Sequence, residues 1–160
     1  MGHRLIDNKK QMEGVFYEPL KQIFDERGAV FHHLNYTSAS FNGFEEVYIS
    51  KTFPGKIKAW KKHLRMTQNF CVPVGGFKFV LFDNRDYSET MNIINEYIVD
   101  DNQNYKLLSI PPNVWYGFQC ISSNAGIIVN LSNLLFDPSE VIKLEVNNDV
   151  IDYNNWVNLD

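Results

Sequence analysis

Short apolar runs separated by polar turn residues recur along the whole chain, and the spacing of an amphipathic helix is nearly absent. Runs of this length at regular spacing are typical of a β-sandwich or a β-barrel. Aromatic residues make up 14% of the chain, which also favours strands. We therefore expect strands over residues 14–17, 29–34, 47–52, 56–60, 69–74, 77–82, 92–99, 105–110, 114–120 and 125–131.

Turn residues stand between these runs, as at Pro54-Gly55 and Pro111-Pro112-Asn113. Gly75-Gly76 lies between two apolar runs and predicts a tight hairpin. Asp137-Pro138-Ser139-Glu140 favours the start of a short helix, whereas residues 147–156 are polar and turn-like. The pattern predicts one all-β domain over residues 1–160, a jelly-roll barrel with little helix.

Composition narrows the class of protein. Hydrophobic residues make up 44% and charged residues 21% of the 160 residues, which excludes a disordered chain or a coiled coil. No apolar run is long enough to cross a bilayer, and the N-terminus lacks the apolar block of a secretion signal. We expect a cytoplasmic protein without a membrane partner. Cys71 and Cys120, both in apolar strand-like runs, are expected to be reduced core thiols.

The charge distribution is uneven. The net charge of −4 gives no sign of a nucleic-acid partner. Five of the 15 cations nevertheless lie between residues 56 and 65, with no acid among them. Strand alternation places Lys61, His63 and Arg65 on one face and Lys58 and Lys62 on the other. This stretch is either a solvated outer face or the polar mouth of a barrel, where the cations bind a phosphate or diphosphate.

The sequence gives little support for a metal site, a nucleophile or a pair of catalytic acids. A lysine at position 61 cannot ligate a metal, and the adjacent His32 and His33 point to opposite faces of a strand, so we expect no metal and no other cofactor. Nucleophile motifs and phosphate-binding glycine loops are absent from the sequence. The acid pairs at 25–26, 45–46 and 100–101 stand in turn-like places, where solvated acids are expected.

Several segments in a fixed order resemble one family. They are Phe24-Asp25-Glu26-Arg27-Gly28-Ala29-Val30-Phe31, Gly55-Lys56-Ile57-Lys58-Ala59-Trp60-Lys61-Lys62-His63, Asp83-Asn84-Arg85, Ile110-Pro111-Pro112-Asn113-Val114-Trp115-Tyr116-Gly117-Phe118 and Asn133-Leu134-Leu135-Phe136-Asp137-Pro138. Together they resemble the motifs of the cupin-type dTDP-4-dehydrorhamnose 3,5-epimerase superfamily. The resemblance implies a cupin barrel that removes and returns protons beside the ketone of a 4-keto-6-deoxy nucleotide sugar.

The resemblance also implies roles for individual residues. The family's catalytic histidine falls on Lys61, and the second histidine of its short-chain pattern falls on His63. The lysine that stabilises the enolate falls on or near Gln68, and a motif histidine falls on Tyr116. The tyrosine that reprotonates the sugar falls on Phe136, which has no hydroxyl. Tyr116 is therefore expected to be a catalytic residue as well, as the first candidate to supply the missing hydroxyl. We expect His63 to be the base with Lys61 stabilising the enolate, and a lysine base at position 61 is the alternative.

Further residues are implied for binding and for orienting the base. Arg27, Lys58, Arg65 and Arg85 are expected to bind the substrate, with Gln68 and Phe136 beside them. The family's aspartate partner of the base has no counterpart, which leaves Asp149, Asp152 and Asp160 as stand-ins.

The family context implies a homodimer in which Arg27 completes the neighbour's pocket. Three functions follow from the resemblance: an epimerase acting at one carbon only, because Phe136 cannot protonate; a nucleotide-sugar 3,4-ketoisomerase; or a cupin that binds sugar nucleotides without catalysis.

Overall fold

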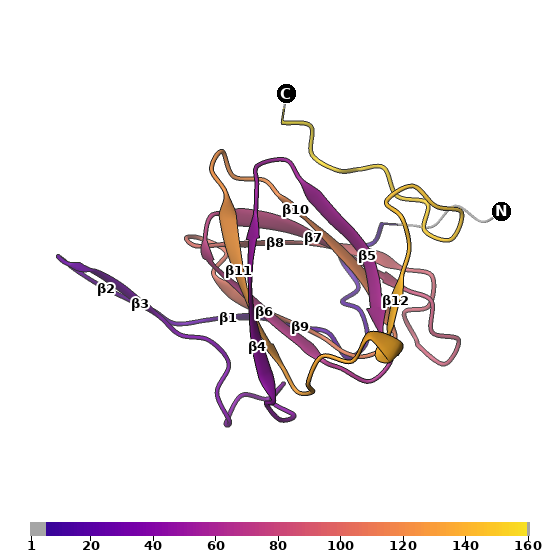
Figure 1. The fold of residues 1–160 in the computed structure, drawn as a ribbon, viewed down its shortest axis with the longest axis horizontal. Helices are drawn as coiled ribbons and strands as arrows, with labels where there is room; N and C mark the ends of the chain where they lie inside the picture. Colours follow the sequence, from indigo (N-terminus) through magenta and orange to yellow (C-terminus); the bar gives the residue numbers. More distant parts are fainter. Residues whose placement is uncertain (1–5, 160) are drawn as a thin grey trace.

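The computed structural model describes residues 6–159, which form two antiparallel five-stranded sheets facing each other and a separate two-stranded hairpin (Figure 1). The first sheet has the order β1 (Phe16–Pro19), β9 (Lys106–Ile110), β6 (Gln68–Val74), β11 (Gly126–Ser132) and β4 (Glu46–Thr52). The second has the order β12 (Val141–Lys143), β5 (Ile57–His63), β10 (Val114–Cys120), β7 (Gly76–Asp83) and β8 (Ile94–Asp100). The hairpin pairs β2 (Gln22–Asp25) with β3 (Gly28–Phe31).

This architecture confirms the predicted all-β jelly roll with little helix. In the described range the helical structure is one 3-10 turn, η1 (Pro138–Glu140), where Asp137 caps the turn by accepting a hydrogen bond from the backbone N–H of Ser139. The chain then enters β12 instead of continuing as a helix. No helix among residues 6–159 is long and apolar enough to span a membrane.

The predicted hairpin at Gly75-Gly76 is wrong. β6 pairs with β9 and β11 in the first sheet, whereas β7 pairs with β8 and β10 in the second, so these glycines turn the chain from one sheet to the other. Gly75 has a φ of +81°, and a side chain there would meet Ser122 Oγ at 2.6 Å. A tight corner with this backbone angle requires glycine. The local pattern marked the turn, but the pairing partners of the two strands are distant in sequence.

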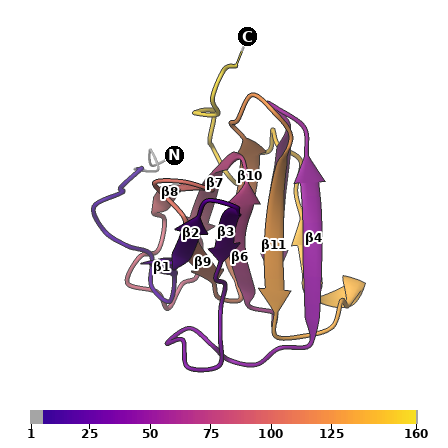
Figure 2. The same ribbon diagram turned by 90° about the vertical axis from the view of Figure 1, so that its left-hand side faces the viewer.

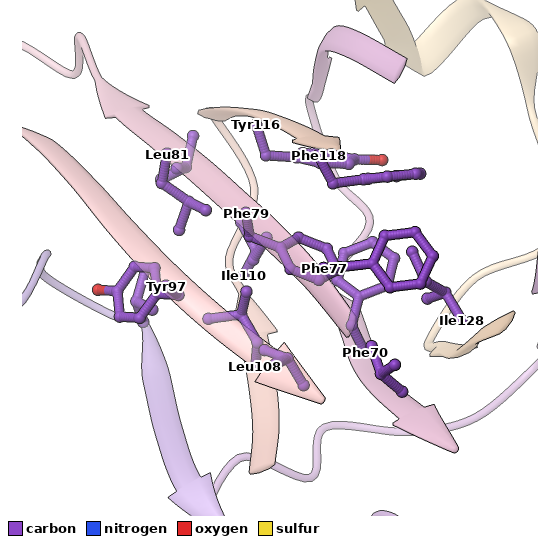
Figure 3. Close-up of a cluster of buried hydrophobic side chains, with 14 of the residues drawn as sticks. Phe70, Phe77, Phe79, Leu81, Tyr97, Leu108, Ile110, Tyr116, Phe118 and Ile128 are labelled. Atoms are coloured by element: carbon purple, nitrogen blue, oxygen red, sulfur yellow. The ribbon is translucent and has the colours of Figure 1, made fainter. Parts of the chain in front are cut away.

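The core lies between the two sheets and is rich in aromatic rings (Figure 3). Phe70 from β6 packs on Phe79 from β7 with ring centroids 5.2 Å apart, and Phe79 packs on Phe118 from β10 at 5.4 Å. Cys120 belongs to the same cluster, and Cys71 is buried as well. Both cysteines are free thiols, as the sequence predicts.

A β-bulge changes the faces of β5. Lys61 pairs with Tyr116 of β10, but Lys58 pairs with Phe118, so three residue steps on β5 match two on β10. Lys58 therefore faces the barrel interior together with Lys61 and His63, and the strict alternation predicted from the sequence is wrong at this point. Gly117 makes the bulge possible, because a Cβ at this position would lie 2.4 Å from the Cβ of Ala59.

The C-terminal segment after β12 has no regular structure up to residue 159, yet it packs closely on the outer face of the second sheet. Ile151 and Tyr153 are buried against Trp60, whose ring lies 5.6 Å from that of Trp156. The ammonium of Lys78 donates a hydrogen bond to the carbonyl of Asn155 at 2.6 Å. This segment covers apolar surface that β5, β7 and β10 would otherwise expose.

The β2–β3 hairpin stands away from the barrel in Figure 1, and in Figure 2 it lies in front of the barrel, towards the viewer. The sequence predicts its second strand but not β2. Phe24 and Val30 are 66% and 61% exposed on it. The hairpin thus leaves these apolar side chains exposed on the surface of the protein.

Candidate active site

A cavity of about 220 Å³ opens between the two sheets of the barrel. One wall comes from the second sheet and the other from the first. The second sheet contributes Lys58, Lys61, His63, Tyr116, Phe118, Val141 and Lys143, and the first sheet contributes Tyr48, Ser50, Gln68, Phe70, Ile128 and Asn130. Met66 and Phe136 complete the lining from connecting segments.

His63 and Glu140 form a buried pair in the wall of the cavity. Glu140 is 2% exposed, and its Oε1 lies 2.5 Å from Nδ1 of His63. The second oxygen, Oε2, accepts hydrogen bonds from the backbone N–H groups of Leu64, Arg65 and Met66, at 3.1, 3.0 and 3.2 Å. These donors hold the carboxylate in place, so that it orients the imidazole ring.

The pKa values fit a neutral histidine beside an ionised glutamate. Burial raises the pKa of the Glu140 carboxyl, but the hydrogen bonds from His63 and the backbone outweigh it, and the pKa lies below its ordinary value. Burial lowers the pKa of His63; the carboxylate of Glu140 opposes this and the charge of Lys61 adds to it, with a net lowering. A neutral His63 donates its Nδ1–H to Glu140, which leaves Nε2 with a free lone pair.

Tyr116 stands next to that nitrogen. Its hydroxyl lies 3.2 Å from His63 Nε2, and the two rings are nearly parallel with centroids 6.0 Å apart. Burial, with a smaller contribution from the charge of Glu140, raises the pKa of Tyr116. The phenol therefore keeps its proton and donates to Nε2 when no substrate is present. Glu140, His63 and Tyr116 form one hydrogen-bonded chain that ends in the cavity.

Three lysines stand at the cavity. Lys58 and Lys61 come from β5, and Lys143 from β12 lies in register with Lys61. Desolvation lowers the pKa of Lys61, and the charges of Lys143 and Lys58 lower it further. Cations that repel one another in this way favour an anionic ligand among them, because its charge relieves the repulsion.

Gln68 lines the cavity and carries an unpaired hydrogen-bond donor. Asn130 Oδ1 accepts the backbone N–H of Asn69 at 2.9 Å, so the Asn130 amide group donates to Gln68 Oε1 at 2.5 Å. Gln68 is 3% exposed, and its Nε2 has no hydrogen-bond partner among the described residues. A buried donor without a partner is costly. A ligand oxygen in the cavity would satisfy it.

Phe136 lies at the rim and is 62% exposed. Its backbone N–H donates to Glu46 Oε2 at 2.9 Å, and the same oxygen accepts the hydroxyl of Tyr48 at 2.6 Å. Glu46 is therefore not the solvated turn acid that the sequence pattern predicts. It starts β4, with its side chain on the same face as that of Tyr48.

Three of the predicted binding residues are not in the cavity lining. Arg65 forms an exposed ion pair with Asp137 at 3.0 Å. Arg85 is 8% exposed and binds the buried carboxylate of Asp83, also donating to the carbonyl of Glu13. Arg27 lies on the exposed hairpin and pairs with Asp25 at 2.7 Å. The short sequence separation of Arg85 and Asp83 favours their pairing over a role at the barrel mouth.

Two of the three expected aspartate partners of the base, Asp149 and Asp152, are wrong. The carboxylate that binds His63 belongs to Glu140, whereas Asp149 and Asp152 are exposed and Asp160 lies outside the described residues. Glu140 occupies the third position after a capping aspartate, a place typical of helix starts, so the local pattern gave no sign of its role. Lys143 and Tyr48 were missed as well. Only Tyr48 had a sequence signal, since alternation along 46–50 puts it on one face with Ser50.

Among residues 6–159 no group of three histidine, cysteine, aspartate or glutamate side chains is arranged to hold a metal ion. The expectation of a metal-free barrel stays a prediction.

Comparison with known proteins gives relatives in sugar biosynthesis, although no family model matches the chain. The chain is 29% identical over 94 residues to Agl13 of Haloferax volcanii, a probable low-salt glycan biosynthesis epimerase; the match covers 58% of this chain and about three-fifths (60%) of that protein. It is 26% identical over 129 residues to SpsL of Bacillus subtilis, a spore coat polysaccharide biosynthesis protein, covering 81% and 85% of the two chains.

Solved structures show that the fold of this chain is also similar to that of known proteins. A dTDP sugar isomerase from Desulfovibrio desulfuricans G20 is 37% identical and superposes with a TM-score of 0.81, covering 84% of this chain and 85% of the other. A dTDP-4-dehydrorhamnose 3,5-epimerase from Elizabethkingia anophelis NUHP1 has a TM-score of 0.77 at 17% identity, with coverages of 92% and 84%. At that identity the likeness concerns the fold alone.

Proposed function

The chain belongs to the cupin-type dTDP-4-dehydrorhamnose 3,5-epimerase-like superfamily of nucleotide-sugar epimerases and isomerases, and we propose that it epimerises a 4-keto-6-deoxy nucleotide sugar. The observation that carries this proposal is the Glu140–His63 pair in a cavity that also holds Lys61 and the unpaired amide of Gln68. Together these groups supply a base and an enolate site. The cytoplasmic location expected from the sequence is part of the same proposal.

His63 is the base in this proposal. Removing a proton beside a ketone needs a neutral acceptor whose pKa is close to the working pH. The lowered pKa of His63 and the hydrogen bond from Nδ1 to Glu140 support that role, because they leave Nε2 unprotonated. Lys61, the alternative base, has a lowered pKa too but has no carboxylate partner to orient it among the described residues. It is better suited to stabilise negative charge.

The enolate oxygen would lie between Lys61 and Gln68. Abstraction of the proton moves the electron pair of the C–H bond into the ring and places negative charge on the ketone oxygen. Lys61 supplies a cation, and Gln68 supplies an N–H donor that Asn130 holds in position. Preorganised donors of this kind stabilise charge that develops only during the reaction.

The volume of the cavity indicates which part of the substrate lies inside it. About 220 Å³ is below the usual volume of a site for a drug-sized ligand, roughly 300–1,000 Å³, so the sugar ring lies inside and the nucleotide extends outwards. Lys58 and Lys143 are then the residues to bind the diphosphate as it leaves the cavity. Relatives named as dTDP sugar enzymes make a dTDP-4-keto sugar the first substrate to test.

The β2–β3 hairpin supports a homodimer, the form that we propose for the active protein. A two-stranded hairpin is marginal in water on its own, and this one exposes Phe24 and Val30. A second copy would cover these side chains. Arg27, near the tip of the hairpin, would then approach the neighbour's diphosphate.

The test is exchange of solvent deuterium into a dTDP-4-keto-6-deoxy sugar. The unaltered protein should incorporate deuterium at a carbon beside the ketone. His63→Asn should abolish exchange and leave dTDP binding intact. Lys61→Met should lower the rate about 10²–10³-fold, as for the loss of one oxyanion donor.

Lys62→Met is the matched control, because Lys62 lies over the ring of Trp115 and outside the cavity lining. Its exchange rate should equal that of the unaltered protein. Nucleotide binding without any exchange would point instead to a non-catalytic sugar-nucleotide binding protein.

A 3,4-ketoisomerase is the second candidate, because the relative with 37% identity is a dTDP sugar isomerase. Both reactions begin with proton abstraction beside the ketone. Analysis of the product separates them, since an isomerase moves the ketone to the neighbouring carbon and an epimerase leaves it in place.

A further inference from the structure

Inversion at a carbon needs two groups on opposite faces of the sugar: a base that takes the proton and an acid that returns one. The proposed function, on which this inference rests, assigns the base to His63. The residue from which the returned proton would be expected is Phe136, which has no acidic hydrogen. An epimerase built on this cavity therefore requires another acid, on the wall that faces His63.

Tyr48 carries a hydroxyl on that wall. It lines the cavity from the middle of β4, and its hydroxyl donates to Glu46 Oε2 at 2.6 Å. The same carboxylate oxygen accepts the backbone N–H of Phe136 at 2.9 Å. Glu46 thus connects the phenol of Tyr48 to the segment that carries Phe136, so a hydroxyl lies close to that segment.

His63 and Tyr48 come from different sheets, so they reach the sugar from different walls of the cavity. His63 lies on β5 in the second sheet, whereas Tyr48 lies on β4 at the edge of the first sheet, on the other side of the barrel (Figure 1). Tyr116 is a weaker candidate, because β10 is the neighbour of β5 and the Tyr116 hydroxyl already lies 3.2 Å from His63 Nε2. Tyr116 is thus on the side of the base.

We propose that Tyr48 is the acid that returns the proton to the sugar, from the wall opposite His63, and that Glu46 positions it. In the first step, Nε2 of His63 takes the proton beside the ketone, and the electron pair of that C–H bond forms the enolate. In the second step, the enolate carbon takes the proton of the Tyr48 hydroxyl on the other face, and the ketone re-forms. Water then protonates the tyrosinate and accepts the proton of the imidazolium, so no net charge is gained or lost.

The protonation states fit these roles. Burial raises the pKa of Tyr48 to about 12, with further contributions from the hydrogen bond and charge of Glu46 and from the charge of Glu140. Tyr48 therefore carries its proton at neutral pH. Glu46 has a lowered pKa, because it accepts hydrogen bonds from Tyr48 and from the backbone of Phe136, so it stays ionised and holds the phenol in place.

The test is Tyr48→Phe, which removes one oxygen and keeps the ring. Because His63 remains, the variant should still exchange solvent deuterium beside the ketone, but with retention of configuration. Formation of the inverted sugar should fall at least about 10²-fold, the lower range for loss of a positioned acid. The readout is the ratio of inverted product to deuterium incorporated, measured by NMR of the sugar. A purely structural role for Tyr48 would lower both rates together and leave this ratio unchanged.

Tyr87→Phe is the matched control, because Tyr87 is 69% exposed and lies outside the cavity lining. Its ratio of inverted product to incorporated deuterium should equal that of the unaltered protein. Glu46→Gln keeps the phenol but weakens its positioning, and should lower the ratio less than Tyr48→Phe does. If Tyr48→Phe does not fold, this variant carries the test, and an unchanged ratio overturns the proposal.

Rescue gives the sharpest outcome. Adding Phe136→Tyr to Tyr48→Phe should restore inversion, because the new hydroxyl stands on the same side as the lost one. Normal inversion by Tyr48→Phe overturns the role of Tyr48 and leaves the epimerase function standing. No exchange by the unaltered protein with any 4-keto nucleotide sugar overturns the proposed function and the role of Tyr48 with it.

Discussion

The imidazole of His63 is subject to opposing influences. Burial lowers its pKa, the Glu140 carboxylate raises it, and Lys61 lowers it again, with a net value below the ordinary one of about 6.5. The base must be unprotonated to act. We therefore expect the exchange rate to rise with pH through an apparent pKa below 6.5 and to stay level above it, which a pH profile of kcat/KM checks. A profile that rises only near the pKa of a lysine would favour Lys61 as the base.

Glu140→Gln tests the role of the carboxylate in the His63–Glu140 pair. The amide keeps the shape but removes the charge that raises the pKa of His63 and fixes its tautomer. The acidic limb of the pH profile should move to lower pH, because the pKa of His63 falls further. The exchange rate should fall about 10²–10⁴-fold. The matched variant is Glu145→Gln, whose carboxylate lies outside the main cavity lining. An unchanged rate and profile in Glu140→Gln would contradict the role given to this carboxylate.

At the scale of one element, the end of β7 is held by a buried carboxylate. Asp83 is 0% exposed and accepts hydrogen bonds from Arg85, Ser88 and Thr90. Burial raises its pKa, but these hydrogen bonds outweigh burial and lower the pKa to about 2. Because an unfolded aspartate titrates near about 3.9, the ionised form contributes roughly 2 kcal/mol of stability above that pH, which is lost as pH falls towards 2.

Asp83→Asn should therefore lower the free energy of unfolding at pH 7 by about 2–4 kcal/mol, because Arg85 is left without its buried partner. The loss of stability between pH 4 and pH 2 should also be smaller than in the unaltered protein. Urea unfolding at several pH values checks both expectations. Equal acid sensitivity of the two proteins would show that another group dominates this range.

At the scale of the whole molecule, the hairpin extends beyond the barrel that it belongs to. It exposes Phe24 and Val30, and the edge strand β4 exposes Ile49 at 71%. Such surfaces are typical of contacts between protein chains. We expect a dimer in sedimentation experiments. Replacing residues 22–31 by a short Gly/Ser linker should yield a monomer that binds dTDP more weakly. A monomeric unaltered protein would contradict the dimer.

Arg27→Ala separates assembly from binding. If Arg27 reaches the neighbour's diphosphate, this variant should remain dimeric and bind dTDP about tenfold more weakly, with less dependence on salt. Lys21→Ala, close to the hairpin, serves as the matched control and should bind dTDP as the unaltered protein does.

The sequence by itself determined every strand except β2 and β12, the cationic stretch of β5 and the family. These features are local, because a strand is encoded by neighbouring residues and a motif by fixed spacings. Lys61, His63, Gln68 and Tyr116 could be selected in this way, and all four line the cavity. The corner at Gly75-Gly76 could be located as a turn, but not as the passage between two sheets.

The tertiary structure decided which groups meet. Glu140 reaches His63 across 77 residues of chain, and the bulge opposite Gly117 turns Lys58 inwards. Tyr48 and His63 line one cavity from two walls because β4 and β5 belong to different sheets. Such contacts depend on strand order and register, which arise from the packing of the whole barrel. Sequence spacing carries no record of them, and the chemistry of the cavity therefore followed from the fold.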